Sequence, residues 1–315
     1  MSFIEEIKTR VKSNNKKTII LTEGSDTRVL EAIEYILKED LANIILLGKP
    51  SYHIPGLNIV IPEESNLLDI FTNELYNLRK NKGLTIEEAR KLLTTNYMYF
   101  ACMLLKNNLA DAVVSGAVNS SLDTFKPALQ IIDKTSVIAS SFMIMDIDGN
   151  RPYIFSDIAL NINPTSEELS IISIDTSNSY KKIFNDIPKT SLLSYSSFSS
   201  GKGESVDKIK KAVQICNIKE PNLIIEGEVQ ADAALNPKTS NFKAPKSAIK
   251  GESNILIFPD LNSGNIGYKL VKEFTKGNSY GPFIQGLNKT ISDLSRGCSS
   301  EEIIGTILIT CLLAV

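Results

Sequence analysis

Residues 18–36 read TIILTEGSDTRVLEAIEYI, and this stretch sets the pattern for the chain. Its first four residues form a β-branched apolar run, which predicts a short buried strand. Polar residues and one glycine follow at 22–26, and apolar residues then recur at Leu30, Ile33 and Ile36 with the spacing of one helix face. The stretch is therefore predicted to form a strand, a turn and an amphipathic helix.

The same alternation continues through the first half of the chain. Apolar strands are expected at 44–48, 57–61 and 112–114. Helices are expected at 3–12 and 97–107, and residues 64–93 are expected to be helical with a break at 78–83. Strands separated by helices predict an α/β fold with a parallel sheet. Because such sheets bind ligands beyond the carboxyl ends of their strands, the segment from Glu23 to Arg28 is expected at the entrance of a ligand-binding site.

A change of pattern near 134–138 suggests a domain boundary. Residues 136–145 and 153–155 are expected to pair as a hairpin around a turn at 146–150. Apolar strands that end in polar clusters follow at 191–195, 223–225 and 255–258, before a helix expected at 266–274. The second half therefore also predicts an α/β unit with ligand-binding loops.

The composition excludes several classes of function. A length of 315 residues suggests two domains, and a net charge of −2 gives no basic surface for nucleic acid. The single histidine, His53, argues against histidine triads and histidine-bound zinc, and the four cysteines lack metal-binding spacing. The first 17 residues do not resemble a secretory signal, so a cytoplasmic location is expected, and the apolar residues 303–315 are too few to span a bilayer.

Two polar loops have features of phosphate-binding loops. Residues 115–121, SGAVNSS, are small and rich in hydroxyls, so their backbone N–H groups could approach a ligand. Residues 196–203, SSFSSGKG, combine hydroxyls, two glycines and a lysine, but they lack the P-loop pattern, and a flexible surface loop explains them equally well. Lys126 is expected in the first turn of a helix at 124–129, where a bound anion would compensate its unfavourable interaction with the helix dipole.

The stretch LSRGCSSEE at 294–302 runs into the apolar C-terminal residues. Ser299 or Ser300 can cap a helix whose first turn carries Glu301 and Glu302. Arg296 lies just upstream, an arrangement that suits phosphate binding, and a carboxylate one turn away could act as a base. From these residues alone, a capped C-terminal helix with a surface arginine is the simpler interpretation.

A series of short motifs runs in order over nearly the whole chain. They are EGSDTRVL at 23–30, LRKNKG at 78–83, VSGAV at 114–118, PALQ at 127–130, LSYS at 193–196, SSGKG at 199–203, QADAA at 230–234, FPDLNSGN at 258–265, QGL at 285–287 and DLSRGCS at 293–299. Together they resemble the phosphate acetyl/butyryl transferase family. The resemblance implies two α/β domains with a cleft between them, similar to isocitrate and isopropylmalate dehydrogenases, with residues 1–137 and 283–315 in the first domain and 138–282 inserted as the second.

The resemblance also implies a reaction and a homodimer. The reaction is reversible transfer of an acetyl group between acetyl phosphate and coenzyme A, by direct thiolate attack in a ternary complex. It needs no metal, no cofactor and no covalent enzyme intermediate, since coenzyme A is a substrate. Nucleic acid and membrane are not expected as partners.

The residues expected to carry this reaction follow from the motifs. Glu302 is the expected base, Arg296 the phosphate anchor and Ser295 a hydrogen-bond donor, while Arg79 and Lys126 are expected to be further phosphate contacts. The remaining expected substrate-binding residues are Ser115, Gly116, Asn119, Ser120, Ser199, Ser200, Lys202, Asn262, Gly264 and Asn265.

Some positions depart from the family pattern. The family usually has Asp at Glu302 and Arg at Lys126, often has His at Asn119, and in some members has Arg near Glu273. A butyryl-preferring acyltransferase and a non-catalytic protein that binds acetyl phosphate or coenzyme A are therefore alternatives. A hydride-transferring dehydrogenase is a rival on fold alone, but the chain has no GxGxxG turn and no clustered metal-binding aspartates.

Overall fold

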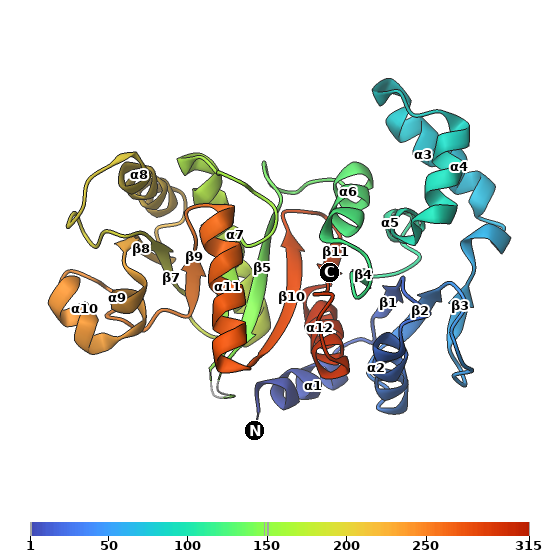
Figure 1. The fold of residues 1–315 in the computed structure, drawn as a ribbon, viewed down its shortest axis with the longest axis horizontal. Coiled ribbons are helices and arrows are strands. Elements are labelled where there is room, and N and C mark those ends of the chain that lie inside the picture. Colours follow the sequence, from blue (N-terminus) through green and yellow to red (C-terminus); the bar gives the residue numbers. More distant parts are fainter. Residues whose placement is uncertain (1, 148, 150, 315) are drawn as a thin grey trace. The chain divides into compact units, whose positions relative to one another are not determined.

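The computed structural model describes residues 2–147, 149 and 151–314, and they divide into two compact units (Figure 1). The first unit contains Phe3–Lys134 and the chain from Leu287 onward, and the second contains Thr135–Gly286. The second unit thus begins and ends a few residues outside the segment 138–282 expected from the sequence. Each unit is an α/β fold.

The first unit is built on parallel strands. Its strands are β1 (Thr18–Leu21), β2 (Asn43–Leu47), β3 (Asn58–Val60), β4 (Ala112–Ser115) and β11 (Thr290–Asp293). Their order is β3-β2-β1-β4-β11, and each of these neighbouring pairs is parallel. The parallel sheet predicted from the alternation is therefore confirmed, and the carboxyl ends of β1, β4 and β11 lie at one edge.

Helices connect and cover these strands. They are α1 (Phe3–Ser13), α2 (Thr27–Lys38), α3 (Leu68–Arg79), α4 (Ile86–Thr95), α5 (Tyr97–Lys106), α6 (Ser121–Ile131) and α12 (Ser300–Leu313), with short 3-10 helices η1 (Pro62–Glu64) and η2 (Lys80–Lys82). The break expected at 78–83 is confirmed, because η2 and Gly83 separate α3 from α4. Helix α12 packs against both α1 and α2 (Figure 1).

The opening stretch folds as its pattern predicts. The Asp26 side chain begins α2 by accepting hydrogen bonds from the N–H groups of Arg28, at 2.9 Å, and Val29, at 3.4 Å. Leu30 and Ile33 are fully buried on the inner face of this helix. Because the strand ends at Leu21 and the helix begins at Thr27, the polar residues between them are held at the carboxyl edge of the sheet.

The second unit contains a mixed sheet. Its strands are β5 (Ser140–Asp146), β6 (Tyr153–Ser156), β7 (Lys189–Leu193), β8 (Ile224–Val229), β9 (Ile255–Ile257) and β10 (Asn278–Gln285), in the order β10-β5-β6-β9-β7-β8. β5 is antiparallel to both β10 and β6, whereas the pairs β6–β9, β9–β7 and β7–β8 are parallel. The predicted hairpin is thus present, although its first strand begins at Ser140 and its predicted turn includes Asp148 and Asn150, which lie outside the described residues.

The helices of this unit are α7 (Ser166–Phe184), α8 (Glu204–Lys219), α9 (Ala231–Leu235), α10 (Pro237–Lys243) and α11 (Leu261–Thr275). Phe155 of β6 and Phe258 after β9 pack with ring centroids 5.4 Å apart, inside a cluster that also contains Met143 and Leu256. The helix expected to begin at residue 266 begins five residues earlier, so 262–265 are helical and do not form a loop before it. Asp260 caps α11 by accepting the N–H of Ser263 at 2.9 Å, so the helix begins at Leu261.

Candidate active site

The turn between β11 and α12 holds the residues that the sequence placed at the centre of the site. Ser299 is the N-cap of α12: its hydroxyl accepts the N–H of Glu302 at 3.2 Å, and the Glu302 carboxylate accepts the N–H of Ser299 at 3.1 Å. This reciprocal pair is a capping box. The buried Glu302, which was expected to act as a base, therefore also stabilises the start of the helix. The main-chain carbonyl oxygen of Ser295, three residues before Cys298 in the turn, accepts the Cys298 N–H at 2.9 Å.

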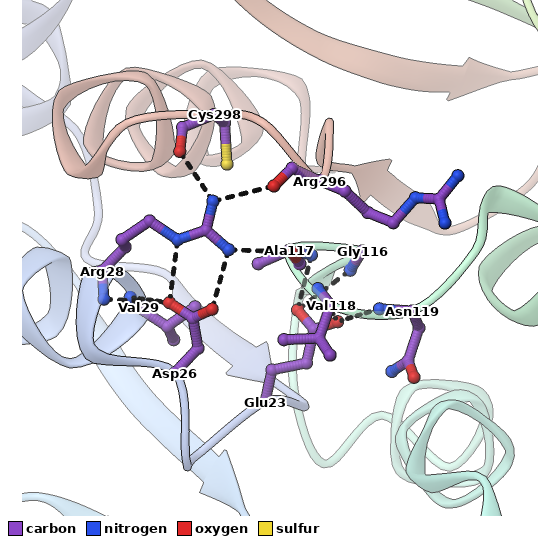
Figure 2. A network of polar contacts seen from close by, with 10 residues as sticks. All are labelled: Glu23, Asp26, Arg28, Val29, Gly116, Ala117, Val118, Asn119, Arg296 and Cys298. Carbon is purple, nitrogen blue, oxygen red and sulfur yellow. Dashed lines mark hydrogen bonds and ion pairs between the residues drawn. The ribbon is translucent and has the colours of Figure 1, made fainter.

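Arg296 is exposed in this turn and its side chain is free. Among the described residues, its guanidinium makes no ion pair or hydrogen bond. Its main chain, in contrast, is held in place, because its carbonyl oxygen accepts a hydrogen bond from Arg28 at 2.9 Å. Figure 2 shows the Arg296 side chain extending away from this anchored carbonyl. A fixed backbone with a free guanidinium suits the binding of an anion from solution.

Arg28 joins three segments of the first unit (Figure 2). Besides Arg296, it donates to the carbonyl oxygens of Cys298, at 2.8 Å, and Ala117, at 2.9 Å. Asp26 orients the guanidinium through two bonds, at 2.7 and 3.1 Å, and this arginine holds the pKa of the Asp26 carboxyl below its usual value. Arg28 was expected near a ligand-binding site, but its hydrogen bonds to distant carbonyl oxygens leave no pattern in the sequence.

The loop after β4 does not offer its N–H groups to a ligand in the structure. Four consecutive N–H groups, at residues 116–119, donate to the carboxylate of Glu23 at 2.8 to 3.0 Å. The Ser115 hydroxyl is buried and bonded to Thr22 at 2.6 Å. The expectation that this loop presents free N–H groups is therefore wrong: Glu23, which was expected to face a ligand, already binds them.

Asn119 and Ser120 lie where the same loop enters α6. Asn119 is exposed and lines a pocket of about 490 Å³ together with Glu23, Lys49 and Tyr97. Ser120 is the N-cap of α6 and its hydroxyl contacts Asp123 at 2.6 Å. Because the helix begins at Ser121, Lys126 is in its second turn and not in the first, as expected from the sequence.

Asp293 is a buried carboxyl group behind this loop. It is fully buried at the end of β11, and neither carboxylate oxygen has a hydrogen-bond partner among the described residues. Burial raises its pKa to about 7, opposed only in part by the neighbouring hydroxyls of Ser121 and Thr124. Gly116 has a φ of +108°, and a Cβ there would lie 2.0 Å from an Asp293 carboxylate oxygen, so this position requires glycine.

Arg79 and Lys126 line one pocket. Its volume is about 450 Å³, and Lys82 and Lys91 are two further cations in its wall. None of the four side chains makes an ion pair within the part of the chain that the structure describes. Tyr99 and Gln130, bonded to each other at 3.0 Å, form another part of the wall. This surplus of positive charge suits phosphate groups.

The loop at 196–203 also encloses a glutamate of its own unit. Glu228 is buried and accepts the Ser196 hydroxyl at 2.8 Å and the Ser199 N–H at 2.6 Å. The Ser200 hydroxyl accepts the N–H of Ser197 at 2.9 Å, whereas Lys202 is exposed. Some of the hydroxyl and N–H groups expected to bind phosphate are therefore used in hydrogen bonds that hold the loop itself.

The remaining predicted residues lie at the start of α11. A Cβ at Gly264 would lie 2.3 Å from the carbonyl oxygen of Asp157, so the helix can approach that segment only with glycine here. The Asn265 amide donates to the carbonyl of Ile158 at 3.1 Å, while Asn262 is exposed. The predicted site residues are thus divided between the two units.

The described residues contain no group of three or more His, Cys, Asp or Glu side chains that could hold a metal ion. Over the same residues, every helix is too short or too polar to cross a membrane. The four cysteines are buried and form no disulfide among the described residues, and burial raises the pKa of Cys216 and Cys311 to about 12.

Comparison with known proteins extends these observations. The chain matches the family described as Phosphate acetyl/butaryl transferase over residues 2–311. A phosphate acetyltransferase from Clostridium acetobutylicum is 43% identical over 328 residues, which cover 98% of each chain. One from Thermoanaerobacterium thermosaccharolyticum is 40% identical over the whole of both chains. The crystal structure of a phosphotransacetylase from Streptococcus pyogenes has a TM-score of 0.89, with 37% identity and 99% of each chain covered.

Proposed function

Because the chain belongs to the phosphate acetyl/butaryl transferase family, we propose that it is an acyltransferase that moves an acetyl group between acetyl phosphate and coenzyme A. The observation that carries the proposal is the turn before α12. There, a guanidinium that has no side-chain partner among the described residues, a hydroxyl and a carboxylate occur within eight residues, at Arg296, Ser295 and Glu302. These are the groups that the reaction requires.

In the proposed reaction, coenzyme A and acetyl phosphate bind together. Glu302 takes the proton of the coenzyme A thiol, and the thiolate attacks the acetyl carbonyl carbon to form the new C–S bond. The C–O bond to phosphate then breaks, and inorganic phosphate leaves with the electron pair. Arg296 neutralises charge on the phosphate and Ser295 donates a hydrogen bond to the substrate. No metal, cofactor or covalent enzyme intermediate takes part.

Other residues are assigned to the phosphate groups of the substrates. The pocket lined by Arg79 and Lys126 has four cations that form no ion pair within the described part of the chain, which supports a role in binding phosphate. Lysine keeps the charge of the arginine usual at position 126 but loses its two-pronged hydrogen bonding. From the second unit we assign supporting contacts to Ser199, Ser200, Lys202, Asn262, Gly264 and Asn265, and from the first to Asn119 and Ser120. Ser115 and Gly116 support the loop from within, since they are buried.

The test is thioester formation by the wild type, Arg296→Ala and Glu302→Gln. Glutamine keeps the N3 position of a capping box filled by a side chain that can still accept the Ser299 N–H, so Glu302→Gln removes the base while preserving the helix cap. We expect turnover by the wild type, a loss of roughly 10²-fold or more in both variants, and little change in melting temperature for Glu302→Gln.

Three results would contradict these assignments. If Glu302→Gln keeps the turnover rate of the wild type, the base is another residue. Wild-type protein that binds both substrates without turning them over would instead be a non-catalytic binding protein. A higher kcat/KM with butyryl phosphate than with acetyl phosphate would make the chain a butyryl-preferring enzyme.

A further inference from the structure

The loop at 116–119 is an anion-binding nest that is occupied by a side chain of the protein itself. One Glu23 oxygen accepts the N–H groups of Gly116, at 3.0 Å, and Ala117, at 2.8 Å. The other oxygen accepts those of Val118, at 2.9 Å, and Asn119, at 3.0 Å. Successive N–H groups that converge in this way create a concave positive site for an anion. Glu23 is buried, so its carboxylate fills this site away from solvent.

Glu23 and Arg28 hold this loop through opposite main-chain groups (Figure 2). Ala117 donates its N–H to Glu23 at 2.8 Å, and its carbonyl accepts from Arg28 at 2.9 Å. The same Arg28 guanidinium also donates hydrogen bonds to the carbonyl oxygens of Arg296 and Cys298. A chain of contacts therefore runs from Glu23 through the loop and Arg28 to the main chain of Arg296.

We propose that Glu23 is a positioning residue for acyl transfer, acting as a built-in anion that fixes the 116–119 loop and, through Arg28, the turn that carries Arg296. The expected effects on kinetics rest on the acyltransferase function proposed above. The nest itself does not depend on that function, since it is defined by four hydrogen bonds within the first unit.

The test replaces the internal anion with one from solution. Glu23→Ala removes the carboxylate and leaves the four N–H groups without an acceptor, so we expect kcat to fall roughly 10- to 100-fold because Arg296 is no longer held in register. Formate is small enough to enter the vacated site, and its two oxygens can accept the same four donors. Added formate should therefore raise both kcat and the melting temperature of Glu23→Ala, whereas chloride at equal ionic strength should raise neither.

Two further variants sharpen the result. Glu23→Gln keeps one carbonyl oxygen but turns an NH₂ group toward the other two donors, so it should be impaired and should not respond to formate. Glu31→Ala removes an exposed glutamate of α2 and should behave as the wild type with and without formate.

The outcomes separate the two proposals. Wild-type kinetics in Glu23→Ala, or a folded but inactive variant whose activity and melting temperature both ignore formate, would overturn the positioning role. If the wild type itself lacks turnover, the function proposed above fails. The formate-dependent rise in the melting temperature of Glu23→Ala would then still decide whether the nest binds an anion.

Discussion

Asp293 has an unusual environment for a carboxyl group, because its position under the 116–119 loop gives it neither solvent nor a hydrogen-bond partner among the described residues. Ionisation there would place a second negative charge near Glu23, which adds to the effect of burial on the Asp293 pKa. The fold therefore favours the protonated acid up to about pH 7.

We predict that Asp293→Asn removes part of the pH dependence of stability. The folded-state pKa, about 7, is above the ordinary value of 3.8, so the protonated group stabilises the fold fully below pH 3.8 and this contribution is lost as the pH rises to about 7. Its size is on the order of 4 kcal/mol. Melting temperatures of wild type and variant, measured from about pH 5 to about pH 8, should show the wild type losing stability relative to the variant. Parallel curves would show that Asp293 does not titrate in this range.

At the scale of elements, helix α12 depends on one cap. Ser299 and Glu302 satisfy each other's N–H groups, and the helix that follows is almost entirely buried. The start of this helix also sets where the Arg296 turn ends, so the cap links the stability of α12 to the geometry of the candidate site.

Ser299→Ala should lower the free energy of unfolding by about 1 kcal/mol, because it removes the acceptor for the Glu302 N–H. The neighbouring Ser300→Ala is the matched control: it makes the same chemical change one residue later, where the hydroxyl does not cap the helix. Thermal or urea unfolding of the two variants checks this. Equal losses in both would mean that the cap contributes no specific stability.

In two places, a glutamate in or just after a strand accepts hydrogen bonds from a neighbouring loop and holds that loop in its conformation. Glu23 follows β1 and binds the loop after β4, and Glu228 lies in β8 and binds the loop after β7. In both cases the loop has the small and hydroxyl-bearing residues that are typical of phosphate-binding loops. Such composition therefore identifies an anion site without showing whether its anion is a ligand or a side chain.

At the scale of the whole molecule, sequence reasoning recovered the parallel sheet of the first unit and the hairpin of the second. It succeeded because apolar β-branched runs and helical spacing are local signals. It failed at 262–265, where asparagine and glycine suggested a loop although Asp260 caps a helix. It also could not detect the contact of Glu23 with Gly116, since these residues are 93 positions apart and the acceptor binds main-chain groups.

Every contact that Glu23 makes in the nest ends on main-chain N–H, and Arg28 likewise recognises its three distant partners by their carbonyl oxygens. Such contacts are indifferent to which side chain stands at 117, 118 or 119. They are sensitive to the number of residues in the loop and to proline, which has no N–H to donate. The segment should therefore tolerate most exchanges at the exposed positions 118 and 119, although not at the buried Ala117, and it should not tolerate insertions or deletions.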